Sequence, residues 1–130
     1  MIIDTSALLA IIRYEPEAPI CARLIEQAEV RRMSAGNLLE AAIVTDAIGD
    51  PVASRRLDEL IEVAGIIIEP VTVEQARIGR DAYRDFGRGS GHPAQLNFGD
   101  CFAYALAKTT GEPLLFKGQD FNHTDLRPAS

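Results

Sequence analysis

Blocks of apolar residues, separated by polar, glycine or proline residues, run along the whole chain and predict alternating strands and helices. The first apolar run stops at Asp4, so we predict a strand over 2–4 and a helix over 5–13, which Thr5 or Ser6 can cap. Further helices are predicted over 19–29, 38–48, 52–64, 72–86 and 97–110, and further strands over 30–35, 66–68 and 113–116.

Local signals refine these elements. Asn37 is the predicted N-cap of its helix, which places Glu40 at the third helical position of a capping box, and the segment 72–75 predicts a second capping box. The continuous β-branched run 66–68 is typical of a parallel strand that is buried on both faces. The tail predicts an edge strand around Leu126.

The order of elements predicts an α/β fold with a parallel sheet covered by helices on both faces. The 130 residues fit one domain over 1–130, and an apolar content of 47% indicates a folded chain. No apolar run approaches the roughly 18 residues of a membrane span, and Asp4 interrupts the apolar start, so we expect no signal peptide and a cytoplasmic protein. Cys21 and Cys101 are expected to be buried thiols.

The net charge of −6 limits the function classes. A protein that binds nucleic acid through a broad electrostatic surface should be basic, so any contact with nucleic acid must be local or assisted by a metal ion. An acidic surface also suits a basic protein partner.

Four acids occupy the same kind of place in the predicted fold. Asp4 ends a strand, Glu40 and Asp100 lie in first turns of helices, and Asp120 follows the last strand. Strand C-termini and helix N-termini share one edge of a parallel sheet, so these acids can converge there. Each acid alone is also explained by the helix dipole, which a first-turn carboxylate complements by about 0.3–1 kcal/mol, or by turn formation.

Together the four acids favour a metal site. Neighbouring carboxylates repel one another, which calls for a cation or for one protonated acid. Hard oxygen ligands without His or Cys favour Mg²⁺, with Mn²⁺ as a possible substitute, over zinc. The chemistry indicated is hydrolysis of a phosphodiester assisted by a metal ion.

Four segments carry a resemblance to a known family: 1–8, 34–41, 96–107 and 114–121. On these segments the chain resembles PIN-domain ribonucleases, and more narrowly the VapC toxins of bacterial VapBC toxin–antitoxin pairs. The resemblance implies a three-layer α/β/α sandwich and a Mg²⁺-dependent endoribonuclease that cleaves RNA.

The resemblance also implies roles for individual residues. Asp4, Glu40 and Asp100 match the family's three principal acids, with Asp4 and Asp100 as the most direct metal ligands. The fourth acid varies in position within the family, and Asp120 is its candidate here. Thr5 or Ser6 would orient the metal ion, water or phosphate.

The implied partners are a VapB antitoxin whose C-terminal segment occupies the acidic groove, and a second copy of the chain in a homodimer. DNA would be contacted only indirectly, through the antitoxin. An Arg or Lys of the antitoxin would satisfy the unpaired carboxylates.

Two other functions stay open at this point. The chain could be a non-catalytic binding partner within a DNA-bound repressor complex. It could also be a phosphoryl-transfer protein on a similar sheet, although segment 4–6 lacks the second acid that haloacid-dehalogenase-type phosphatases carry. His92 is expected to be an exposed loop residue without a fixed neighbour, and His123 stays open because it lies close to Asp120. Loop 87–96 would contribute to the choice of RNA, whose identity the sequence does not give.

Overall fold

The protein is described by a computed structural model that covers residues 1–129, so Ser130, the last residue of the predicted domain 1–130, lies outside the described part. Within these residues four parallel strands form one sheet in the order β3-β2-β1-β4. The strands are short, and they are β1 (Ile2–Ile3), β2 (Arg32–Ser34), β3 (Ile67–Glu69) and β4 (Leu114–Leu115).

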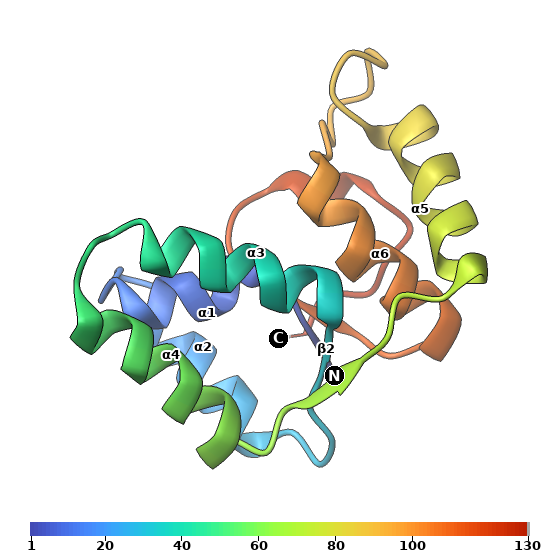
Figure 1. Ribbon diagram of the computed structural model, residues 1–130. Coiled ribbons are helices and arrows are strands. Elements are labelled where there is room, and N and C mark those ends of the chain that lie inside the picture. Colours follow the sequence, from blue (N-terminus) through green and yellow to red (C-terminus); the bar gives the residue numbers. More distant parts are fainter. Residues whose placement is uncertain (130) are drawn as a thin grey trace.

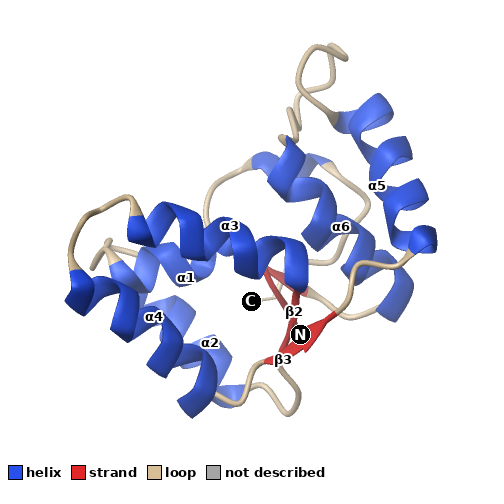
Figure 2. Cartoon of the chain, in the orientation of Figure 1, coloured by secondary structure: helices blue, strands red, loops and turns tan. Residues whose placement is uncertain are grey.

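Helices connect the strands, as the sequence predicted (Figures 1 and 2). They are α1 (Thr5–Ile12), α2 (Ala18–Gln27), α3 (Ala35–Asp46), α4 (Pro51–Val63), α5 (Val73–Phe86), α6 (Phe98–Thr110) and the short 3-10 helix η1 (Asp120–His123). Within residues 1–129, no helix is long and apolar enough to cross a membrane.

The sheet separates two layers of helices, because successive residues of a strand point to opposite faces. Ile3, Met33 and Leu115 pack with apolar residues of α1–α4, whereas Ile2 and Leu114 pack with α5 and α6. Figure 1 shows α1–α4 on one side and α5 and α6 on the other. The predicted three-layer α/β/α sandwich is confirmed.

The predicted start of α3 is wrong. The helix begins at Ala35, and the Ser34 hydroxyl caps it by accepting a hydrogen bond from the Gly36 N–H at 3.2 Å. β2 therefore runs directly into α3 without a loop. This earlier start buries Asn37 in the first turn and moves Glu40 from the first turn to the second.

Three smaller predictions also change. Ile67 of β3 is 46% exposed, so this strand, at one of the two edges of the sheet, is not buried on both faces. The tail does not form a strand around Leu126, but it makes an isolated parallel bridge between Pro128 and Leu114 of β4. Cys21 is buried as predicted, whereas Cys101 is only half-buried.

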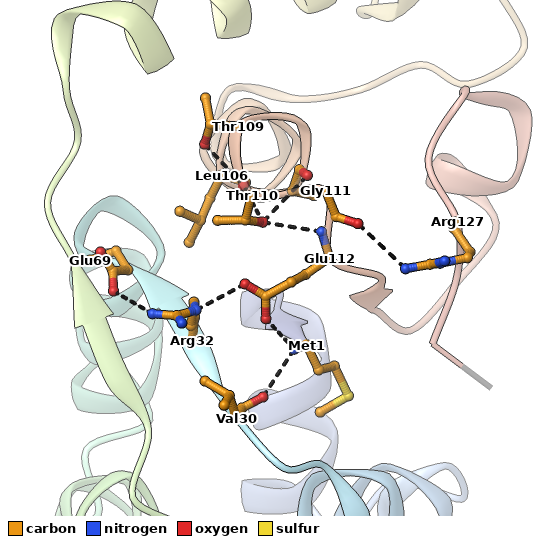
Figure 3. A network of polar contacts seen from close by, with 11 residues as sticks. Met1, Val30, Arg32, Glu69, Leu106, Thr109, Thr110, Gly111, Glu112 and Arg127 are labelled. Carbon is orange, nitrogen blue, oxygen red and sulfur yellow. Dashed lines mark hydrogen bonds and ion pairs between the residues drawn. The ribbon is translucent and has the colours of Figure 1, made fainter.

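The edge of the sheet where β1, β2 and β4 begin is held by a polar network (Figure 3). Arg32 donates to Glu112 at 2.9 Å and to Glu69 at 3.0 Å. The amino group of Met1 donates to Glu112 at 2.6 Å and to the Val30 carbonyl oxygen at 2.9 Å. This network joins the starts of β1, β2 and β4, and through Arg32 it reaches Glu69 at the end of β3.

Candidate active site

Asp4 lies where β1 turns into α1 and is 3% exposed. It is the N-cap of α1, because its Oδ2 accepts a hydrogen bond from the Ser6 N–H at 3.0 Å. Its other oxygen, Oδ1, is buried and has no hydrogen-bond partner among the described residues. Burial, with a smaller contribution from the charge of Glu40, raises the pKa of Asp4 to about 6, although the hydrogen bonds from Ser6 and Thr5 lower it.

Asp100 lies in the first turn of α6, in a capping box with Asn97. The Asn97 N–H donates to Asp100 Oδ2 at 3.0 Å, and the Asp100 N–H donates to Asn97 Oδ1 at 2.9 Å. Burial, followed by the charge of Asp4, raises the pKa of Asp100 to about 7. Smaller contributions come from Asp120 and Glu40, so Asp4, Glu40 and Asp120 all lie within electrostatic reach of Asp100.

Glu40 reaches this site from the second turn of α3. Its side chain lies against Gly99, where a β-carbon would overlap with the carboxylate. Asn37 Nδ2 donates to Glu40 Oε1 at 3.4 Å and to the Gly99 carbonyl oxygen at 3.0 Å. Asp120, by contrast, is exposed at the start of η1.

The hydroxyl groups of Thr5 and Ser6 contact protein groups around the site. Thr5 Oγ1 donates to the Asn37 carbonyl oxygen at 3.1 Å, and Ser6 Oγ accepts from the Lys117 N–H at 2.9 Å. They therefore tie α1 to α3 and to the segment after β4. A direct role of either hydroxyl toward a metal ion, water or phosphate stays a prediction.

Asn37 is the residue that sequence reasoning missed. The prediction made it an N-cap, whereas it is fully buried between Glu40 and Gly99. One signal was available in the sequence. Ser34, a good N-cap, lies three residues earlier, so an alternative start would have placed Asn37 inside the helix, one turn before Glu40.

His92 does have fixed neighbours, so that prediction is wrong. Its ring packs edge-on against Phe86 with centroids 4.9 Å apart, and its Nδ1 accepts a hydrogen bond from the Ala94 N–H at 3.1 Å. His92 thus shapes the loop between α5 and α6. His123 is exposed at the end of η1.

Two of the four acids, Asp4 and Asp100, fit a divalent cation. Within residues 1–129, no group of three His, Cys, Asp or Glu side chains stands close enough to hold a metal ion. Mg²⁺, however, is commonly held by one or two carboxylates and several waters. Two mutually repelling carboxylates, with a buried oxygen of Asp4 lacking a partner, fit such an ion. Glu40 as a third metal residue stays a prediction.

Comparison with known proteins decides the family. The PIN domain family model matches residues 1–126. Ribonuclease VapC28 of Mycobacterium tuberculosis is 59% identical over 129 residues, which are 99% of this chain and 97% of that protein. The chain belongs to the VapC ribonuclease family. Another VapC ribonuclease of that organism, VapC42, is 50% identical over 99% of this chain and 98% of its own length.

Solved structures share the VapC fold at low sequence identity. The crystal structure of M. tuberculosis VapC20, described as a toxin that cleaves the sarcin–ricin loop, has a TM-score of 0.72 at 18% identity and covers 98% of both chains. A toxin–antitoxin complex from Klebsiella pneumoniae has a TM-score of 0.69 at 13% identity, over 95% of this chain and 92% of that one. As a VapC ribonuclease, the chain is a nuclease and therefore a hydrolase.

Proposed function

We propose that this VapC ribonuclease is a Mg²⁺-dependent endoribonuclease that hydrolyses RNA phosphodiester bonds and acts as the toxin of a toxin–antitoxin pair. The observation that carries the proposal is the pair of buried carboxylates Asp4 and Asp100, whose charges raise each other's cost of ionisation. A divalent cation would remove that cost. Mn²⁺ would serve in place of Mg²⁺, because both prefer oxygen ligands.

The residues of the site would divide the work. Asp4 and Asp100 would hold the metal ion, which when bound supplies charge stabilisation at the phosphate and a water of lowered pKa. Burial of both carboxylates strengthens their attraction for the cation, because solvent screens it less. Glu40 would contribute negative charge and orientation from α3, and Asp120 would do so from the exposed rim. Thr5 and Ser6 would fix Asp4 and the elements around it.

The test compares Asp4→Asn and Asp100→Asn with the wild type on a single-stranded RNA. Asn keeps an oxygen that can accept the capping hydrogen bond at each position, so both variants should fold. We expect the cleavage rate of each variant to fall by more than about a hundredfold. This loss is larger than the usual loss when a residue that only orients a metal ligand is replaced.

Asp81→Asn is the matched control, because Asp81 is an exposed carboxylate of α5 whose ion-pair partner among residues 1–129 is Arg84 alone. EDTA should stop cleavage by the wild type, and Mg²⁺ should restore it. If Asp4→Asn or Asp100→Asn cleaves RNA normally, the proposal fails. If no variant cleaves RNA and the acids affect only the binding of the antitoxin, the non-catalytic alternative holds.

The proposed partner is a VapB-type antitoxin with a basic segment. At the acidic site, Asp4 Oδ1 has no hydrogen-bond partner within residues 1–129, and an Arg or Lys side chain would satisfy it. Such a segment would compete with the metal ion and with RNA. Any contact with DNA would come through the antitoxin, and the toxin would act in the cytoplasm, where its RNA substrate lies.

The second proposed partner is another copy of the chain. A groove of about 410 Å³ runs between α5 and α6 and is lined mainly by apolar side chains. Phe98, at its rim, is 76% exposed, and Tyr83 is 44% exposed. A groove and an exposed aromatic ring on one surface suit a two-fold contact, in which each copy supplies the ring that the other receives. A homodimer through this face is therefore the proposed assembly.

A further inference from the structure

Asn37 connects the three elements that carry the principal acids. Its side-chain nitrogen donates to Glu40 of α3 and to the Gly99 carbonyl oxygen of α6. Its backbone carbonyl oxygen accepts from Thr5, the residue after Asp4. The side chain is fully buried.

The chemistry of the surroundings fixes the orientation of the Asn37 amide. If the amide were turned over, its oxygen would face a carbonyl oxygen and a carboxylate, and three acceptors would stand together without a hydrogen. The nitrogen must therefore face Glu40 and Gly99. This leaves Oδ1 buried without a hydrogen-bond partner among the described residues, which is unfavourable for stability.

Two glycines allow α3 and α6 to approach each other closely beside Asn37. A β-carbon at Gly36 would lie 2.5 Å from the ring of Phe102, and a β-carbon at Gly99 would overlap with the Glu40 carboxylate. The first two turns of α3 and of α6 are thus packed closely together. A fold selected for stability alone would fill such a contact with apolar atoms, whereas here a neutral amide donor lies beside a carboxylate.

We infer that Asn37 is a positioning residue of the proposed ribonuclease, which holds the Glu40 carboxylate against α6 beside Asp100. The inference rests on the proposed function, because the arrangement matters only if these acids act together. Asn37 itself touches neither metal ion nor RNA in this account. It works through Glu40.

The experiment uses Asn37→Leu, which keeps the approximate volume but removes the donor, and Asn37→Asp, which keeps the shape but replaces the donor with an acceptor. Thr45→Val is the control. Thr45 is a fully buried polar residue of the same helix whose hydroxyl also lacks a partner among the described residues, but it lies more than two turns away from Asn37. Cleavage of a single-stranded RNA, the thermal midpoint of unfolding and a crystal structure of each variant are measured.

We expect both Asn37 variants to lower kcat by about ten- to a hundredfold, as is usual for groups that orient ligating carboxylates. The thermal midpoint of Asn37→Leu should not fall below that of Thr45→Val, and Thr45→Val should keep wild-type kcat. Because Asn37 acts through Glu40, the double variant Asn37→Leu/Glu40→Gln should be no slower than Glu40→Gln alone.

Wild-type kcat in Asn37→Leu, or losses that multiply in the double variant, would overturn the inference. If Asn37 had a merely structural role, Asn37→Leu would lower the thermal midpoint, and the losses of activity from Asn37→Leu and Glu40→Gln would combine independently in the double variant. If the wild type does not cleave RNA with Mg²⁺, the proposed function fails. The crystal structures then decide separately whether Asn37 positions Glu40. Glu40 leaving Gly99 in both variants supports the positioning role, and Glu40 staying in place refutes it. Asn37→Asp keeps the test open should Asn37→Leu fail to fold.

Discussion

The Glu40 carboxylate rests on the α-carbon of Gly99, one residue before Asp100, so a side chain at residue 99 and the observed position of Glu40 exclude each other. This relationship makes Gly99→Ala a sharp test of the site. The added β-carbon must displace Glu40, and we expect cleavage of RNA to fall at least about tenfold, as when an orienting group is lost.

Gly79→Ala is the control for Gly99→Ala. Gly79 lies within α5, and a β-carbon there would stand 3.4 Å from the Cys101 carbonyl oxygen, which is close but not an overlap. This variant should fold and cleave RNA at the wild-type rate. Equal activity of both glycine variants would show that the position of Glu40 does not matter.

The metal-free protein should become less stable as pH rises from about 4 to about 7. Asp4 and Asp100 have folded-state pKa values of about 6 and about 7, above the ordinary aspartate value of 3.8, so the folded state binds more protons than the unfolded state in this window. Thermal unfolding in EDTA at a series of pH values measures the effect.

Asp100→Asn removes one such carboxylate and should raise stability near pH 8, by about 2–3 kcal/mol. An unchanged or lower midpoint in that variant would contradict the burial of a costly charge.

Divalent metal ions should reverse this instability. An ion that binds only the folded state stabilises it by about 2.7 kcal/mol at a hundred times its dissociation constant. We therefore expect Mg²⁺ or Mn²⁺ to raise the thermal midpoint of the wild type near pH 8, and to raise that of Asp4→Asn much less. All buffers are free of Ca²⁺ and have the same ionic strength. Binding of the ion at the site is then distinguished from screening of charges by comparing Asp81→Asn with Asp4→Asn, because screening would change the thermal midpoints of both variants alike.

Most of the fold was predictable because its elements carry strong local signals. Asn97 stands directly before an apolar helix and is the N-cap that the structure shows. At the first helix the predicted cap is wrong, because the N-cap is Asp4 and not Thr5 or Ser6. The parallel order of the sheet follows from helices that connect successive strands. The exposure of Ile67 was not predictable, because an isoleucine run reads the same in a central strand and in an edge strand, and strand order is set by tertiary packing.

The site was predictable in its acids but not in their supports. Carboxylates at the ends of strands and helices can be identified one by one from the sequence. The resemblance to a family then assigns them to a single site. The role of Asn37 depends on a contact with Gly99, 62 residues away in the chain, which no local pattern encodes. The fixed neighbours of His92 were missed for the same reason, since its contact with Phe86 exists only once the loop has closed.

Phe98→Asp tests the proposed homodimer. Phe98 is the first residue of α6, where an acid favours the helix dipole, so the variant should fold. Placing a charge on the rim of the α5–α6 groove should prevent an apolar contact between copies. Light scattering after size exclusion should then give the mass of two chains for the wild type and of one chain, about 14.1 kDa, for the variant.

Ile20→Asp is the control, because Ile20 is a 48% exposed apolar residue in the first turn of α2, outside the residues that line the groove. It should remain dimeric. A wild type that is monomeric at all concentrations, or a dimer that survives Phe98→Asp, would refute a contact through this face.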